Sequence, residues 1–176
     1  CSGCTSTACG PPCARTTDMA LRRRRWRVRA ATDGFDLNLP EAERDLLAHL
    51  LPQIREVVQS PDEERARRLF PTAYPDDIER DAEYHRFMRE ELVASRLAAL
   101  EQFEKTAKAD HVDEAALLAW MQSINSVRLV LGTLLGVTED HDLDDLTQDD
   151  PQFAEYALYG YLSALLEEIV DALSRS

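Results

Sequence analysis

The stretch from Asp113 to Gly136 most constrains what this chain folds into, because its apolar spacing and both of its ends point to a helix. Apolar residues recur along it at steps of three and four, the period of one helix face: Leu117, Trp120, Ile124, Val127, Leu131 and Leu134. Asp113 can cap the first turn, and Gly136 can adopt the left-handed conformation that ends a helix. The sequence therefore predicts a helix of roughly 23 residues, about 35 Å long.

A second strip on the same helix brings polar groups to the margin of the apolar face. At 100° of rotation per residue, this strip contains Met121, Asn125, Arg128 and Gly132. Asn125 and Arg128 lie three residues apart and so face the same side. Two interpretations stay open: the pair bonds buried loop carbonyls and carboxylates, or it binds a ligand or partner protein.

The length of 176 residues fits one domain, which can bury about 70% of its unfolded surface. No run of 18 apolar residues occurs, so the sequence predicts no membrane span and no membrane partner. All four cysteines lie within the first 13 residues. This distribution does not fit a secreted disulfide scaffold, whose bridges tie folded elements together.

Charge is divided unevenly along the chain, whose formal net charge is −13. The first 30 residues hold seven arginines against one acid, and the remainder carries 13 basic and 32 acidic residues. Contacts to condensed DNA need clustered Lys and Arg. We therefore expect no strong DNA binding by the acidic body unaided.

Two short stretches near the N-terminus alternate apolar and polar side chains, Arg25–Ala30 and Phe35–Leu39. This alternation is typical of half-buried strands, and Asp33 with Gly34 between them favours a tight turn. Residues 1–21 contain few large apolar side chains and are expected to be disordered. The sequence thus predicts a short β-hairpin at the start of a single domain over residues 22–176.

Three more segments carry helical spacing. The first opens at Pro40, with Asn38 or Leu39 as its cap, and Pro52 should kink or split it; its expected buried face is Leu46, Leu47, Leu50, Ile54 and Val57. The second runs from about Asp81 to Lys108, with a face of Tyr84, Met88, Leu92, Ser95, Ala99 and Phe103. The third follows Pro151, and helical spacing along it is kept by Leu158, Leu162, Leu165, Ile169 and Leu173. The predicted fold is mainly α, a bundle of about four to five helices with the hairpin.

The stretch from Arg68 to Asp77 should be an ordered loop. Pro71 and Pro75 each restrict the preceding residue and forbid a continuous helix. Its aromatic and aliphatic side chains are too apolar to remain in water. We expect ion pairs to pin the loop, formed among Arg67, Arg68, Asp76 and Asp77.

Motifs for catalysis or metal binding have little support. His49, His85, His111 and His141 share no spacing, and no glycine-rich phosphate loop or nucleophile elbow is present. Asp140, Asp142 and Asp144 begin like a calcium loop, but the required glycine and the final glutamate of such a loop are replaced by Asp145 and Pro151. The sequence predicts a protein that is not an enzyme and that holds no cofactor or metal.

Cys9 and Cys13 place two thiols within five residues. The nearby arginines favour the thiolate, and exposed thiols in a positive environment are typical of redox switches. An inert tail and zinc binding by all four cysteines stay open as alternatives, although the cysteine spacing is cramped for a structural zinc site. The chain begins with Cys, and globular sequence starts at Met19. Two further interpretations are that the residues before Met19 extend upstream of the natural start of translation, and that Cys1 is the mature N-terminus of a lipoprotein.

Several motifs in order resemble an actinobacterial family, formerly of unknown function, that includes the oxidative-stress regulator AosR. The resemblance covers roughly residues 23–175 and includes the basic strand with Trp26. It rests on three further groups of residues: Arg68–Tyr74 with Asp76 and Asp77; Trp120, Asn125, Arg128, Leu129 and Gly132; and the run Tyr156–Leu166.

The resemblance implies a cytoplasmic helical protein that regulates transcription in response to oxidants, through contact with a sigma factor or RNA polymerase. It implies that Cys9 and Cys13 form the sensing disulfide, since their spacing and place match the family's pair. It also marks a polar strip that is either partner-binding or structural: Asn125, Arg128, Arg68, Tyr74 and Trp120. The alternative is a structural or adaptor protein without redox control.

Overall fold

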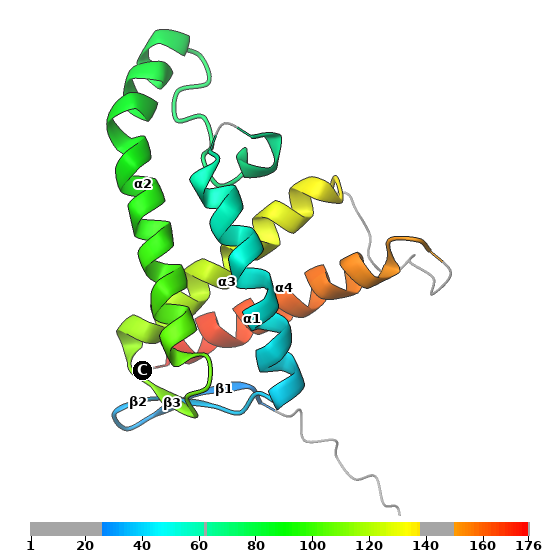
Figure 1. Cartoon of the computed structure of the whole chain (residues 1–176). Helices are drawn as coiled ribbons and strands as arrows, with labels where there is room; N and C mark the ends of the chain where they lie inside the picture. Colours follow the sequence, from blue (N-terminus) through cyan, green and yellow to red (C-terminus); the bar gives the residue numbers. More distant parts are fainter. Residues whose placement is uncertain (1–25, 62, 138–149, 176) are drawn as a thin grey trace, which may run out of the picture.

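A computed structural model describes residues 26–61, 63–137 and 150–175 of the chain. Within these ranges it contains four α-helices, three strands and the short 3-10 turn η1, Glu64–Ala66. The helices are α1, Glu41–Gln59; α2, Ile78–Thr106; α3, Glu114–Leu134; and α4, Phe153–Leu173. The strands are β1, Val28–Ala31; β2, Gly34–Leu37; and β3, His111–Val112. The predicted mainly α fold with an N-terminal hairpin is confirmed (Figure 1).

Some predicted features lie outside the described residues. These are the tail 1–21 with Cys9 and Cys13, and the acidic stretch 139–149 with its aspartates. No described helix combines the length and apolar character that crossing a membrane requires.

The sheet has the order β1-β2-β3, with both pairs antiparallel. The two-residue hairpin loop is Thr32 and Asp33, because Gly34 already pairs with Ala31; the predicted turn was one residue late. Gly34 has φ +150°, and a Cβ there would lie 2.5 Å from the carbonyl oxygen of Val112. The glycine therefore lets β3 approach. Two residues are too few to show a period, so the sequence did not predict β3.

α3 lies at the centre of the helical layer and packs against both α2 and α4 (Figure 1). Its predicted ends are confirmed: Asp113 Oδ1 accepts a 2.8 Å hydrogen bond from the Ala116 amide, and Gly136 has φ +65°. Its predicted apolar face is buried except at the last turn, where Leu134 is 59% exposed. Val130, which the predicted face omits, is buried.

Pro52 does not split α1, which continues from Glu41 to Gln59. A proline inside a helix removes one hydrogen bond, but apolar burial on both sides of it holds the two halves in place. The buried face is Leu47, Leu51, Ile54, Val57 and Val58. The predicted face was wrong at Leu46, which is 42% exposed, and it omitted Leu51.

α2 is 29 residues long and starts three residues before the predicted position. Asp77 sets this start, since its Oδ1 accepts a 3.0 Å hydrogen bond from the Arg80 amide. Burial is confined to the C-terminal part of the helix, at Ala99, Leu100 and Phe103. The first half of α2 projects beyond the other helices (Figure 1), and the predicted side of the helix is only half-buried there, at Tyr84, Met88 and Leu92.

The loop after η1 is ordered by burial of Leu69 and Phe70, as predicted. The ion pairs expected across it do not occur among the described residues. Instead, Arg96 Nη2 donates a 2.7 Å hydrogen bond to the Leu69 carbonyl oxygen. Arg68 Nη2 donates to the carbonyl oxygen of Val137, at 2.6 Å. Arginine side chains therefore hold this loop through backbone oxygens.

Arg44 on α1 ties the helices to the sheet. Its side chain is only 12% exposed and forms an ion pair of 3.0 Å with Asp110. Its N–H groups also donate to four backbone carbonyls, at 2.7 to 3.4 Å: those of Leu37, Leu39, Ala107 and Ala109. One arginine thus joins α1 to the end of β2 and to the link between α2 and β3.

We expect Arg44→Met to lower the free energy of unfolding by at least about 2 kcal/mol, because several half-buried carbonyls lose their donor at once. Urea denaturation measures this loss. The matched control is Arg65→Met, since the Arg65 side chain is 43% exposed and, among the described residues, its hydrogen bonds go to Glu63. The control should change stability by less than about 0.5 kcal/mol. Equal losses in the two variants would contradict the anchoring role of Arg44.

Candidate functional site

Asn125 and Arg128 form one polar unit with α4. Arg128 Nη1 donates to the Tyr159 hydroxyl and Nη2 donates to Asn125 Oδ1, both at 3.2 Å. The guanidinium also lies 5.8 Å from the centre of the Tyr159 ring, within the range of a cation–π contact. The two polar residues predicted to share a face of α3 therefore contact each other and reach across to α4.

Gly132 extends this unit toward Arg68. A Cβ at Gly132 would lie 3.0 Å from both Arg68 Nη1 and Tyr159 Cε2. The absence of a side chain thus lets an arginine from the loop and a tyrosine from α4 close over α3. Three of the predicted strip residues, Asn125, Arg128 and Arg68, are brought together around Tyr159 in this way.

Trp120 and Tyr74 do not join this unit. Trp120 is fully buried, with its ring 4.2 Å from that of Phe103, and its Nε1 donates a 2.8 Å hydrogen bond to Thr106 Oγ1. Tyr74 lies near the start of α2, with the Arg80 guanidinium 4.1 Å from its ring centre. The structure therefore places Trp120 in the core and Tyr74 at the projecting end of the molecule.

A groove lies beside the Asn125–Arg128 pair, between α3 and α4. Two adjoining hollows share Leu166 and Val170, and one is lined by Arg128 while the other is lined by Asn125. We call the combined surface the α3–α4 groove, and the residues that line it are Arg96, Leu118, Met121, Gln122, Asn125, Arg128, Ser163, Leu166, Glu167, Val170 and Asp171. Leu118 is 41% exposed and Val170 is 48% exposed. The groove therefore offers apolar surface next to guanidinium groups.

Two arginines of the groove lack a carboxylate partner. Arg96 Nη1 donates to Ser126 Oγ at 3.1 Å, and its half-burial lowers its pKa. Neither Arg96 nor Arg128 forms an ion pair in the described parts of the chain, and the Nε of each is buried without a hydrogen bond there. Two carboxylates, Glu167 and Asp171, line the same hollow as Arg128, so the groove carries charges of both signs.

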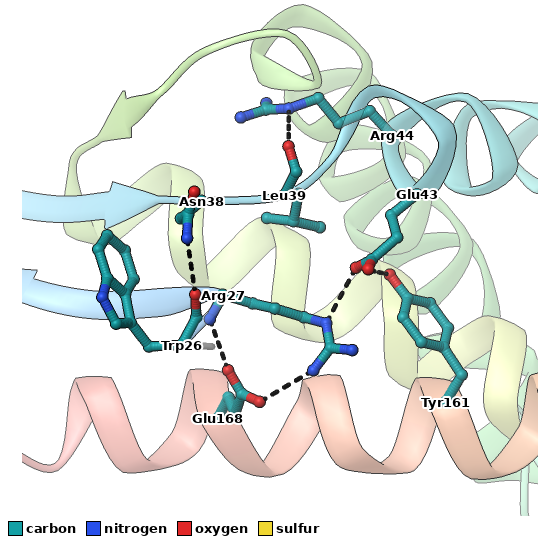
Figure 2. Close-up of polar contacts among 8 residues, drawn as sticks. All are labelled: Trp26, Arg27, Asn38, Leu39, Glu43, Arg44, Tyr161 and Glu168. Atoms are coloured by element: carbon teal, nitrogen blue, oxygen red, sulfur yellow. Dashed lines mark hydrogen bonds and ion pairs between the residues drawn. The ribbon is translucent and has the colours of Figure 1, made fainter. Parts of the chain in front are cut away.

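A second polar cluster joins the strand side of the molecule to α1 and α4 (Figure 2). Arg27 Nε pairs with Glu43 Oε2 at 2.9 Å, and Arg27 Nη1 pairs with Glu168 Oε1 at 3.1 Å. The Arg27 amide donates to the other oxygen of Glu168 at 2.8 Å. The Tyr161 hydroxyl donates to Glu43 Oε2 at 3.0 Å. This cluster fixes the residue just before β1 to two helices.

Burial and the neighbouring Glu43 raise the pKa of Tyr161 above its ordinary value. Burial lowers the pKa of Arg27, but Glu43 and Glu168 outweigh it and raise that pKa. Sequence reasoning missed this cluster because Arg27 was counted with the arginines of the N-terminal arm. One signal in the sequence could have indicated a buried ion pair: Glu168 is a charged residue directly before the core residue Ile169.

In the described ranges, no group of three His, Cys, Asp or Glu side chains lies close enough together to hold a metal ion. Two of the scattered histidines instead lie beside carboxylates. His85 Nε2 is 3.5 Å from Asp81, and His111 Nδ1 is 3.1 Å from Asp36.

The model of one protein family, a domain of unknown function (DUF2017), matches residues 22–173. The chain belongs to the DUF2017 family. Searches of curated proteins and of solved structures give no match. The matched range contains the sheet, all four described helices, the α3–α4 groove and the Arg27 cluster. Cys9 and Cys13 precede the range that matches DUF2017.

We expect Arg128→Ala in this DUF2017 protein to lower the free energy of unfolding by about 1–3 kcal/mol, because Tyr159 and Asn125 lose a half-buried partner. Denaturant melts measure the change. Arg86→Ala is the control, since Arg86 is exposed and its guanidinium lies 4.9 Å from the centre of the Phe87 ring. A change in Arg128→Ala as small as about 0.5 kcal/mol would show that this residue is no structural anchor.

We expect Tyr161→Phe to flatten the loss of stability at high pH. Above about pH 10 an ordinary tyrosine ionises, so Tyr161 loses its proton in the unfolded chain but keeps it in the folded one. The folded state then binds more protons, and stability falls as pH rises. Unfolding free energies of parent and variant between about pH 9 and 11 test this. Parallel curves would show that the raised pKa of Tyr161 does not contribute.

Proposed function

We propose that this DUF2017 protein is a redox-responsive transcriptional regulator of an oxidative-stress response, and that it acts in the cytoplasm by contacting a sigma factor or RNA polymerase. The observation that carries the contact is the α3–α4 groove, where the exposed Leu118 and Val170 adjoin Arg128. The resemblance to the family of the regulator AosR supplies the kind of partner.

The groove favours protein recognition over catalysis. Its lining combines apolar side chains with two guanidinium groups, two carboxylates, two amides and one hydroxyl, a mixture that suits contact with another protein. The strong acidity of the chain beyond residue 30 favours a protein partner over nucleic acid. We therefore propose a non-enzymatic regulator that does not depend on DNA contacts by its helical body.

The redox half of the proposal rests on Cys9 and Cys13 and on their match to the family's pair. A peroxide oxidises one thiolate to a sulfenic acid and releases water or hydroxide. The second thiol then displaces the sulfenic oxygen as water and forms the disulfide. Two thiols are oxidised and one peroxide is reduced to two waters. Arg27, 14 residues after Cys13, pairs with Glu43 of α1 and Glu168 of α4.

A second candidate is an adaptor protein without redox control. The observation that favours it is the DUF2017 match over residues 22–173, which contains the groove but neither cysteine. An adaptor would use the same groove and bind its partner equally well under reducing and oxidising conditions.

We expect mild peroxide to join Cys9 to Cys13 and to change the amount of sigma factor or RNA polymerase that the protein retains in a pull-down. Peptide mapping identifies the disulfide, and circular dichroism should show an unchanged helical body. The double variant Cys9→Ser, Cys13→Ser should bind without responding to peroxide. Its matched control, Cys1→Ser with Cys4→Ser, should respond like the parent.

The competing outcomes separate the two candidates. Binding that stays the same in peroxide, in the parent and in the double variant alike, would support the adaptor. The absence of any sigma factor or RNA polymerase under both conditions would overturn the proposed regulator.

A further inference from the structure

We propose that the open edge of β1 binds an extended segment of a partner protein, which pairs with β1 as a further strand of the sheet. The pairing uses the backbone N–H and C=O groups of Val28 and Ala30. The site goes beyond the proposed function, because its lining shares only Asp171 with that of the α3–α4 groove.

The register of the sheet sets the direction in which the backbone groups of β1 point. The Asn38 amide donates to the Arg27 carbonyl oxygen at 2.8 Å, so the backbone of Arg27 faces β2. The Leu37 amide, opposite Val28, donates away from β1, to the chain just before β3. Because successive residues of an antiparallel strand direct their backbone groups to opposite sides, Val28 and Ala30 direct theirs away from β2.

These outward groups are unpaired in the part of the chain that the structure describes. β1 is the first strand in the order β1-β2-β3, and no hydrogen bond within the described ranges uses the backbone of Val28 or Ala30. An open edge of this kind is a template with which another extended chain can pair. The opposite edge offers less backbone, because β3 has only two residues.

A hollow beside this edge can receive such a chain. In Figure 2 the residues at the start of β1 lie between β2 and α4, and α4 contacts β1. The hollow has a volume of about 530 Å³, within the roughly 300–1,000 Å³ of typical binding sites. We call it the β1–α4 hollow. It is lined by Trp26 and residues 28–30 on the strand side, and by Glu168, Asp171, Ala172 and Arg175 on the other side.

Charge does not select the occupant of the β1–α4 hollow, because each charged side chain of the lining already has a partner of opposite sign. These ion pairs are Arg29 with Asp36, Asp171 with Arg175, and Glu168 with Arg27. The unpaired backbone groups therefore select the occupant. They require an extended chain, since a helix already uses its own N–H and C=O groups internally.

The side chains of an added strand would alternate between two environments. One set would point toward the end of α4. The other set would lie on the outer face of the sheet, where Trp26 is 37% exposed and its ring centre lies 4.4 Å from the Arg29 guanidinium. Exposed aromatic surface of this kind is typical of protein interfaces. We therefore expect a partner segment with apolar side chains at every second position.

A displayed library of peptides, selected on the full chain under reducing conditions, supplies the probe. Synthetic copies of a selected peptide each carry one N-methyl group, which replaces the N–H of a single backbone amide. Methylation at every second residue should weaken binding at least about tenfold, because those amides face β1. Methylation at the residues between them should change binding much less. A dependence without this period of two would overturn the inference.

Amide hydrogen exchange, followed by NMR, locates the pairing on the protein. In the free chain the amides of Val28 and Ala30 should exchange fast, and the selected peptide should slow both at least about tenfold. The amide of Arg29, which faces β2, should change little. Slow exchange at Val28 and Ala30 in the free monomer would contradict the proposal, because it would show that another segment of this chain already covers the edge.

A pair of variants at one position tests the role of the outward N–H. Ala30→Pro removes this N–H, and proline is tolerated on an edge strand where the N–H faces outward. The variant should bind the peptide at least about tenfold more weakly. Ala30→Ser keeps the N–H and should bind like the parent. Circular dichroism checks folding, and the N-methyl series and the exchange experiment use the parent chain, so they decide the question even if Ala30→Pro does not fold.

Three further outcomes would overturn the inference: no peptide is selected, a folded Ala30→Pro binds like the parent, or light scattering shows a dimer of this chain that Ala30→Pro separates. The last outcome would assign the edge to a second copy. A peptide that pairs with β1 stands even if no sigma factor is retained in the pull-down. The failure of the proposed function and the failure of this inference are therefore distinguishable.

Discussion

The burial of α3 is the constraint on which the rest of the structure depends. Leu117, Trp120 and Ile124 are fully buried, so the rotation of the helix about its axis is fixed. Once that face points into the core, Asn125 and Arg128 can only lie at its margin, where α4 meets α3. The position of the candidate site is therefore a consequence of core packing, and the groove beside it is the surface that this packing leaves open.

Arginines connect the elements around this core, and their partners divide them into two groups. Arg27 pairs with two carboxylates, and Arg44 pairs with one carboxylate and also donates to backbone carbonyls. These contacts suit a purely structural role. Arg96 and Arg128 pair with hydroxyl, amide or carbonyl oxygens only, within the described ranges. Because removing either group's contacts should destabilise the fold, stability alone does not reveal a binding role. What distinguishes the second group is its place: both arginines line the α3–α4 groove, beside the exposed Leu118 and Val170.

Local sequence patterns predicted the elements that local physics controls. The ends of α3 follow from Asp113 and Gly136, and the apolar faces of α3 and α4 follow from helical spacing. The sequence left open whether Pro52 kinks or splits α1, and the helix is continuous because burial against other elements outweighs the lost hydrogen bond. The projection of α2 was also missed, since spacing shows which residues share a face and not whether a neighbour covers them. Asn125 and Arg128 were found by spacing, but the pairing of Arg27 with Glu168 joins residues 141 positions apart and leaves no periodic signal.

Photo-cross-linking in cells tests the central claim, that the α3–α4 groove is the surface through which this DUF2017 protein contacts the transcription machinery. A photoreactive amino acid is placed at Val170, in the groove, and separately at Leu46 on α1, which has similar exposure. The account predicts a covalent adduct with a sigma factor or an RNA polymerase subunit from position 170 and none from position 46. An adduct with the transcription machinery from position 46 alone, or no adduct from position 170, would contradict it.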